Sequence, residues 1–237
     1  MSNRLPVVRL VAEVLVIVAS ILLAFGIDAW WGERQERIEE TEILQGLREE
    51  FDRSWTVLEK QNAYHSSALL SFEALLAASH RGSWESKTQS IDEALGDLIG
   101  PPTTDLGSGV LDALVGAGKI QILSNQSLRT KLASWKGVFE EAHDDEVLGR
   151  NFVFDRVVPY LAKHGVPLSG AFDHTRKRWR ASIADDADAL SRLLADPEFH
   201  TILEVRYGFA SHTTGEYESA MKAIAEILAE IERSLSE

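Results

Sequence analysis

The chain has 237 residues, of which 45% are apolar, and carries 24 Lys and Arg against 37 Asp and Glu, so its formal net charge is −13. This acidic balance excludes the electrostatic attraction on which nucleic-acid binding depends. The absence of cysteine excludes a thiol nucleophile and a disulfide framework, and it fits an oxidising compartment without free thiols.

An apolar segment near the N-terminus, VAEVLVIVASILLAFGIDAWW, predicts a membrane-spanning helix over residues 10–31. At about 1.5 Å per residue this helix is roughly 33 Å long, which is enough to cross the lipid bilayer. Arg9 and Glu13 are expected to pair at one boundary of the span. Asp28, Trp30 and Trp31 mark the other boundary, where indole rings are stable at headgroup depth.

A cleaved signal peptide is the alternative interpretation of this segment, since basic residues precede it and AFG at 24–26 is an acceptable small-residue cleavage site. The helical pattern that continues beyond that site favours an uncleaved span. Basic residues are nearly balanced across the span, but the whole net negative charge follows it. This distribution favours the bacterial inner membrane, with a cytoplasmic N-terminus and a periplasmic bulk. Ser20 and Ala24 form a small-xxx-small step that permits close helix packing.

Three regions are therefore expected: a short cytoplasmic N-terminus over residues 1–9, the span over 10–31 and a helical domain over 32–237. Apolar residues recur at steps of three and four over residues 44–76, which predicts one long helix. Gly32 is the strongest helix breaker between the span and this helix. The two helices are either continuous or joined by a hinge at that glycine.

Capping and breaking residues divide the rest of the chain into further helices. In chain order they are a capping box at Ser90 and Glu93, a glycine stop at Gly116 and Gly118, a cap at Ser124 or Asn125, a proline kink at Pro159 and a helix start at Asp196-Pro197. No segment alternates convincingly with period two. The sequence predicts an all-α fold, in which the transmembrane helix continues into a long helix of an antiparallel helical bundle.

Four segments carry a resemblance to a known family: GIDAWW, VLDALVGAGKIQILSNQSLRTKLASW, FVFDRVVPYL and LLADPEFHTILEVR. Together they resemble a family of uncharacterised bacterial single-span membrane proteins with an N-terminal anchor and a helical extracytoplasmic domain. The residues that match its pattern are Leu114, Gly118, Ile120, Asn125, Leu128, Arg129 and Leu132. These are structural motifs, so the resemblance implies a topology and a fold and no established activity.

No catalytic, cofactor-binding or metal-binding residue is predicted. The stretch EEAH at 140–143 contains one Glu-x-x-His step, which is half of a carboxylate-bridged di-metal site, but the sequence has no second step. A solvated acidic turn is the preferred interpretation. The stretch GAGK at 116–119 lacks the first glycine and the Ser or Thr of a phosphate loop, so it is interpreted as a helix end.

Two polar residues, Asn62 and His65, interrupt the apolar stripe of the long helix. Polar residues at such positions often set helix register or oligomer number, and this is the preferred interpretation. The alternative is a small-molecule pocket between the bundle helices near Asn62, His65 and Trp135.

The only dense basic run consists of Arg176, Lys177, Arg178, Trp179 and Arg180. A solvated loop that pairs with nearby acidic residues is the preferred interpretation. The alternative is a docking patch for an acidic partner or lipid headgroups, with the tryptophan as its anchor.

These observations predict a non-enzymatic, membrane-anchored periplasmic protein that acts as an interaction, scaffold or accessory subunit of a larger inner-membrane complex. A respiratory or photosynthetic complex is one option, which the sequence does not show. The expected partner is a membrane protein or a second copy of the chain. A periplasmic small-molecule binding module is one alternative, and a carboxylate-based metalloenzyme or hydrolase is another.

Overall fold

The computed structural model describes residues 5–87, 89–100, 104–167, 172–173, 178–179 and 181–236. The helices are α1 (Leu5–Arg81), α2 (Ile91–Ile99), α3 (Gly109–Gly116), α4 (Gln126–Phe152), α5 (Val158–Lys163), α6 (Ala187–Ala195) and α7 (Pro197–Ser236), with the 3-10 turn η1 (Lys119–Ile122) and the π-helix η2 (Val153–Val157). Two short antiparallel strands, β1 (Phe172–Asp173) and β2 (Arg178–Trp179), complete the described elements. The predicted all-α fold is confirmed.

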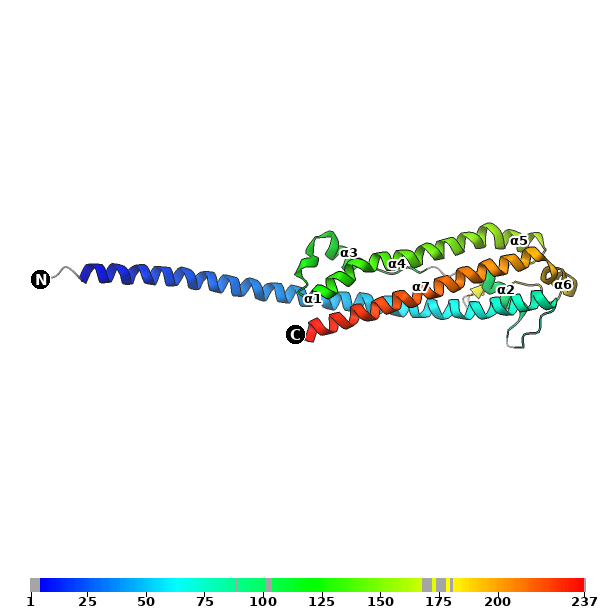
Figure 1. The fold of residues 1–237 in the computed structure, drawn as a ribbon, viewed down its shortest axis with the longest axis horizontal. Coiled ribbons are helices and arrows are strands. Elements are labelled where there is room, and N and C mark those ends of the chain that lie inside the picture. The colour runs from blue at the N-terminus through cyan, green and yellow to red at the C-terminus, as the bar shows by residue number, and fades with distance from the viewer. Residues whose placement is uncertain are drawn as a thin grey trace.

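The longest element, α1, is one continuous helix of 77 residues (Figure 1). It passes through Gly32 without interruption, so the hinge that the glycine allowed is not present. The helix is exposed over residues 13–38, and its first fully buried side chain is Leu44. Its N-terminal part projects from the bundle as a single rod, and its C-terminal part is a core helix of the bundle.

The bundle is built from three long helical segments, two of which run parallel to each other and antiparallel to the third (Figure 1). The helix α1 and the run α4–η2–α5 point away from the projecting rod, whereas α7 returns toward it and packs against both. Shorter elements cover the two ends: α3 and η1 lie where α1 enters the bundle, and α6 lies at the far end. The C-terminus therefore lies at the rod-proximal end of the bundle.

The long helices pack along seven-residue repeats of buried positions, which is the pattern of left-handed helix packing. On α7 this repeat runs through Phe199, Leu203, Arg206, Ala210, Thr213, Tyr217, Ala220, Ile224, Ile227 and Ile231. On α1 the apolar spacing over residues 44–76 predicts that Trp55, Leu69 and Leu76 face the core, but at each of them the buried stripe is shifted by one residue. Ser54, Ala68 and Leu75 are buried, and their neighbours Trp55, Leu69 and Leu76 are only half-buried.

The predicted helix ends are confirmed by their hydrogen bonds. Ser90 and Glu93 form both bonds of a capping box at the start of α2. The side chain of Asn125 accepts the backbone N–H of Leu128 at the start of α4. Gly118 takes a φ of 66°, the left-handed region that only glycine adopts without strain.

The predicted kink before Pro159 takes the form of the π-helix η2. Proline has no N–H to donate to the preceding turn, so the regular hydrogen-bond ladder cannot continue through it. A π-helical turn is one of the known ways in which a long helix absorbs such an irregularity. The run from α4 to α5 consequently stays a single packed layer.

Acidic side chains fix the segment between α2 and α4. Glu50 of α1 accepts the backbone N–H groups of Val110 and Leu111 at 2.6 and 3.2 Å. Glu40 accepts the N–H and the hydroxyl of Ser124 at 2.5 and 2.7 Å. Part of the acidic excess of the chain therefore satisfies backbone donors at helix starts, where negative charge is stabilising.

Candidate functional site

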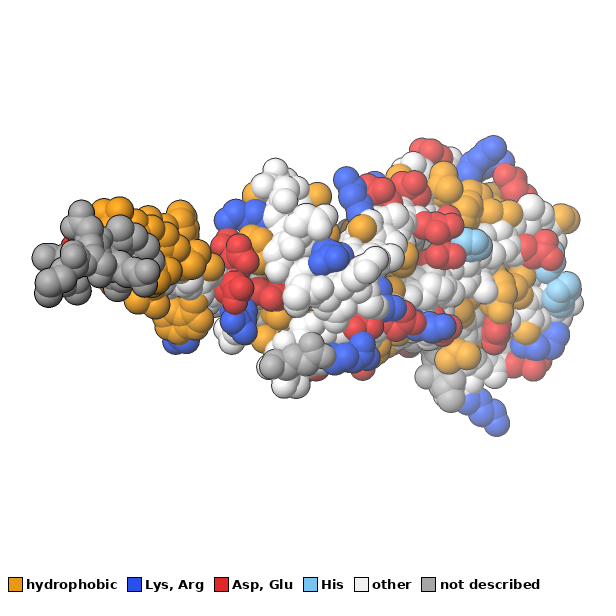
Figure 2. Space-filling model, turned by 60° about the vertical axis from the view of Figure 1, so that its left-hand side comes forward, with side chains coloured by type: hydrophobic (Ala, Val, Ile, Leu, Met, Phe, Trp, Pro, Cys, Tyr) orange, Lys and Arg blue, Asp and Glu red, His pale blue; other side chains and the backbone are white. Residues whose placement is uncertain are grey.

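Three features of the structure are candidates for function: the projecting helix, a buried polar layer in the middle of the bundle, and a groove beside α7. The projecting helix is long and apolar enough to cross a membrane, by length and composition. Its side chains from Val14 to Trp31 are exposed, and apolar side chains dominate its surface, in contrast to the mixed charges of the bundle (Figure 2).

The predicted boundary residues lie on this one exposed helix. Glu13 precedes the apolar stretch, and Asp28 lies beside Trp30 and Trp31, whose ring centroids are 6.3 Å apart. The side chain of Arg9 lies outside the described residues. The spacing of the two ends agrees with the length expected of a membrane span.

The helix-packing residues of the span, Ser20 and Ala24, are both exposed on the rod. The Ser20 hydroxyl donates a hydrogen bond to the carbonyl of Val16 at 2.8 Å, so its polar group is satisfied within its own helix. The small step at residues 20 and 24 therefore offers a flat surface to a neighbouring helix.

The polar layer connects four parts of the chain through buried side chains. Glu146 of α4 accepts the backbone N–H of Thr104 at 3.0 Å and also its hydroxyl. The Thr104 hydroxyl lies 2.6 Å from that of Tyr217 on α7. The Tyr217 ring meets His65 of α1 edge to face, with centroids 5.4 Å apart. This chain of contacts fixes the register of α1, α4 and α7 at one level.

Burial changes the proton affinity of this layer. Burial lowers the pKa of His65 to about 4, and the nearby positive charge of Arg206 adds to the effect, so this imidazole is neutral at physiological pH. Burial raises the pKa of Glu146, against the hydrogen bonds from Thr104. Asn62 Oδ1 and His65 Nε2 are buried, and neither has a hydrogen-bond partner in the described part of the chain.

Trp135 does not join Asn62 and His65, so the predicted three-residue pocket does not form. Its ring meets Phe51 of α1 at 5.4 Å, edge to face. At about 1.5 Å per residue, His65 lies roughly 21 Å further along α1 than Phe51. The tryptophan belongs to the rod-proximal core, and the two polar residues lie near the middle of the bundle.

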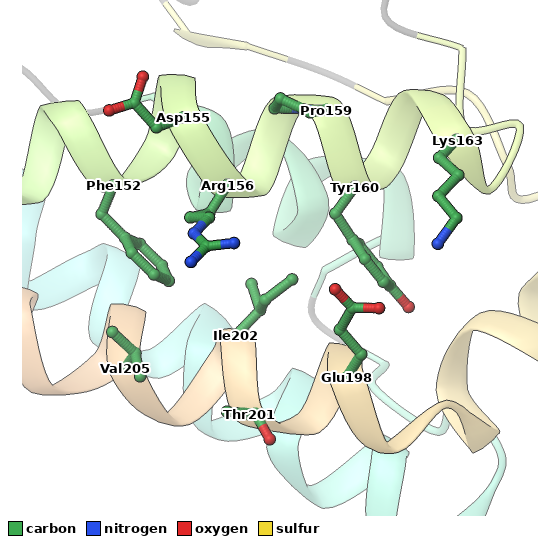
Figure 3. Close-up of a pocket in the computed structure, with 10 residues that line it drawn as sticks. All are labelled: Phe152, Asp155, Arg156, Pro159, Tyr160, Lys163, Glu198, Thr201, Ile202 and Val205. Atoms are coloured by element: carbon green, nitrogen blue, oxygen red, sulfur yellow. The ribbon is translucent and has the colours of Figure 1, made fainter.

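A groove with a volume of about 460 Å³ lies between η2–α5 and α7 (Figure 3). Its lining residues are Phe152, Asp155, Arg156, Pro159, Tyr160, Lys163, Glu198, Thr201, Ile202 and Val205. Phe152, Ile202 and Val205 form an apolar floor, and the Arg156 guanidinium points between the two helices (Figure 3). Arg156 makes no ion pair with the residues that the structure describes.

One end of the groove is held by a tyrosine and an aspartate. The Tyr160 hydroxyl donates to Asp196 Oδ2 at 2.8 Å. Burial and this carboxylate raise the pKa of Tyr160, and the same hydrogen bond lowers that of Asp196, so the pair stays as hydroxyl donor and ionised acceptor. Asp196 also caps α7 by accepting the Glu198 N–H at 2.8 Å. This wall of the groove is therefore rigid.

Comparison of the chain with protein-family models, with curated proteins and with solved structures gives no match. The resemblance to an uncharacterised family of single-span proteins therefore stays a prediction. Function has to be inferred from the features of the molecule itself.

The basic run at 176–180 is only partly described. Arg178 and Trp179 make up the strand β2, which pairs with β1. These two residues are therefore not in the loop that the sequence suggested. Arg176, Lys177 and Arg180 lie outside the described residues. The docking patch stays a prediction.

The acidic stretch at 140–143 is solvated, as expected, since Glu140, Glu141 and His143 are all exposed. It lies inside α4, and Glu146 in the next turn is buried with its carboxylate 3.7 Å from His143 Nδ1. Four residues of the polar layer were not predicted from the sequence: Glu146, Thr104, Tyr217 and Arg206. A signal existed for three of them, because Glu146 continues the spacing of Leu132, Trp135 and Phe139 on α4, and the other two lie on the buried repeat of α7.

Proposed function

We propose that the protein is a membrane-anchored periplasmic interaction module, a scaffold or accessory subunit of a larger inner-membrane complex. The observation that carries this proposal is the continuity of α1, which is both the exposed apolar rod and a core helix of the bundle. An unbroken helix holds a domain at a defined height, which a flexible linker does not do. A fixed height is useful to a protein that has to meet a partner at one level above the membrane.

The height of the bundle above the membrane follows from the rise per residue of α1. Leu44, where the core begins, lies about 20 Å beyond Trp31, and His80 lies about 74 Å beyond it. The rings of His80 and His200 are 4.5 Å apart, which places the start of α7 and the groove at the far end of the bundle. The groove is thus presented roughly 70 Å from the bilayer surface.

The partner that fits this groove is a protein segment with an apolar side chain next to a carboxylate. The apolar side chain would cover the floor formed by Phe152, Ile202 and Val205, and the carboxylate would pair with Arg156. Charge-assisted pairing of arginine with a carboxylate is directional, so it adds specificity to the apolar contact. Because the whole chain is acidic, the exposed Arg156 of this groove is a selective feature.

Co-purification from native membranes in a mild detergent tests the interaction. Val205 is 39% exposed in the groove, and Val205→Glu places a carboxylate beside Arg156 and blocks the floor. We expect the wild type to retain a partner that this variant loses. Val115→Glu on α3, at an exposed valine outside the groove, is the matched control and retains the partner. Recovery of the wild type only as an isolated monomer, across several detergents, would refute the proposal.

The proposed orientation has its own test, because the chain has no cysteine. A single cysteine at exposed Ser83 is expected to react with a membrane-impermeant maleimide in intact spheroplasts. A cysteine in the N-terminal segment is expected to react only after lysis. The opposite labelling pattern would place the bundle in the cytoplasm and would contradict the proposed location.

Binding of a small polar molecule is a second candidate function. It is supported by Asn62 Oδ1 and His65 Nε2, which are buried without partners among the described residues. Such groups are costly unless a bound molecule or water satisfies them. Native mass spectrometry of the purified chain would reveal a bound molecule, and His65→Phe should abolish it. A wild type that shows only the mass of the chain would remove the support for this candidate.

A further inference from the structure

A group of metal-binding side chains lies beside the groove. It consists of Asp145 of α4 with His212 and Glu216 of α7, and one donor atom from each lies within 4.8 Å of the others. His212 and Glu216 are four residues apart, so they project from one face of α7. The packing of α4 against α7 brings Asp145 to that face. Two helices therefore supply one imidazole and two carboxylates to a single point.

Asp145 and His212 lie within ion-pair distance of each other, but their geometry is not that of a hydrogen bond. Asp145 Oδ2 lies 2.6 Å from His212 Nδ1, and this oxygen is buried and accepts no hydrogen bond from the described residues. The unprotonated nitrogen of a neutral imidazole and a carboxylate oxygen both offer lone pairs to a cation. A cation near both atoms would satisfy them.

Space for such a cation is present. A pocket of about 290 Å³ is lined by Asp145, Val205, Gly208, Phe209 and His212. A Cβ atom on Gly208 would meet nothing within 4 Å, so the surface beside Asp145 and His212 is open to water. Open coordination positions could therefore be filled by water molecules.

We propose that Asp145, His212 and Glu216 bind one divalent transition-metal ion, with Zn²⁺ as the best fit. One imidazole, two carboxylates and a water molecule form a tetrahedral set of the kind that zinc accepts. At about 2.1 Å from each donor, a tetrahedral ion separates its donors by roughly 3.4 Å. The aspartate and the histidine then have to move apart by less than about 1 Å, within the reach of side-chain rotation. This proposal does not depend on the proposed interaction function.

Isothermal titration calorimetry tests the site on the full-length chain in detergent, after treatment with a chelator and dialysis. We expect Zn²⁺ to bind the wild type at one saturable site. His212→Ala and Asp145→Asn should each weaken binding at least about tenfold, since even residues that only support a ligand change metal affinity by that factor. A wild type without saturable binding would overturn the proposal.

The matched control is His200→Ala on the same helix. His200 lies 3.4 Å from Glu204 and meets the ring of His80, so it is the most plausible competing zinc ligand on α7. We expect this variant to bind Zn²⁺ as the wild type does. Loss of binding in His200→Ala, with binding retained in His212→Ala, would assign the ion elsewhere and overturn the proposal.

Thermal unfolding gives a second readout. A ligand that binds only the folded chain raises the melting temperature by mass action. We expect Zn²⁺ to raise the melting temperature of the wild type and of His200→Ala, but not of His212→Ala. The side chain of His212 is 63% exposed, so its replacement by alanine leaves the folded bundle intact in the absence of metal. An equal rise in His212→Ala would contradict the assigned ligands.

Discussion

Glu146 on α4 holds Thr104 by both of its donors, the backbone N–H at 3.0 Å and the hydroxyl. The Glu146 side chain is only 1% exposed, so water cannot replace either donor. The same threonine hydroxyl lies 2.6 Å from that of Tyr217. One carboxylate thus joins the loop before α3 to two of the three long helices.

Replacement of Thr104 by valine is expected to destabilise the bundle by about 1–3 kcal/mol, because Glu146 and Tyr217 lose a partner in a buried place. Urea unfolding of the chain in detergent measures the loss. Thr130→Val is the matched control, since Thr130 is exposed on α4 and its hydroxyl bonds only within its own helix. Equal destabilisation of the two variants would show that the buried hydrogen bonds of Thr104 contribute no more to stability than an exposed one.

Because His65 is buried, we expect the free energy of unfolding of the protein to fall in acid. Burial and the charge of Arg206 lower its pKa to about 4, so between that value and its ordinary value of 6.5 the unfolded chain binds more protons than the folded one. Stability therefore falls as the pH drops through this window, by up to about 3 kcal/mol.

Unfolding free energies measured across this window test the role of His65. His65→Phe should remove most of the slope, because phenylalanine cannot bind a proton. His80→Phe, at an exposed histidine of the same helix, should keep the wild-type slope. A His65→Phe variant with the slope of the wild type would contradict the prediction.

Arg206 is a buried cation without an acidic partner among the residues that the structure describes. Its guanidinium lies 5.1 Å from the centre of the Phe72 ring, and its Nε donates to the Leu98 carbonyl at 3.4 Å. Burial lowers its pKa to about 10. Replacement by methionine removes an unpaired buried charge and keeps most of the packing.

We expect Arg206→Met to be as stable as the wild type or more stable, and Arg206→Lys to be less stable. Lysine keeps the charge and loses the planar group that stacks on the ring. The midpoints of denaturant unfolding compare the variants. A methionine variant that unfolds well below the lysine variant would mean that the charge has a partner in the folded protein.

The continuity of α1 predicts a single distance between spin labels on the rod and on the bundle. Cysteines at Ser20 and Glu49 lie about 44 Å apart along an unbroken helix. Pulsed electron–electron double resonance in nanodiscs should give a narrow distribution of spin–spin distances near this value. Gly32→Pro should broaden and shorten the distribution, and Gly32→Ala should leave it narrow because nothing lies within 4 Å of the added Cβ. A broad wild-type distribution would indicate a hinge.

Helix ends were predictable because their causes are local. The capping box of Ser90 and Glu93, the cap at Asn125 and the start at Asp196-Pro197 each depend on atoms within a few residues of one another. The phase of the buried stripe was less predictable. Ser54 is buried in place of Trp55 because the neighbouring helices determine which of two adjacent residues faces the core.

The amino-acid sequence by itself determined the apolar N-terminal helix, the all-α class and most helix starts, since apolar spacing and capping act over short stretches of chain. Only the tertiary structure decided which polar groups meet. Thr104 is 42 residues from Glu146 and 113 from Tyr217, and Asp145 reaches His212 only because α4 packs against α7. Such contacts depend on how helices pack across the bundle. Packing brings together residues that lie far apart in the chain, and their spacing in the sequence does not predict the contact.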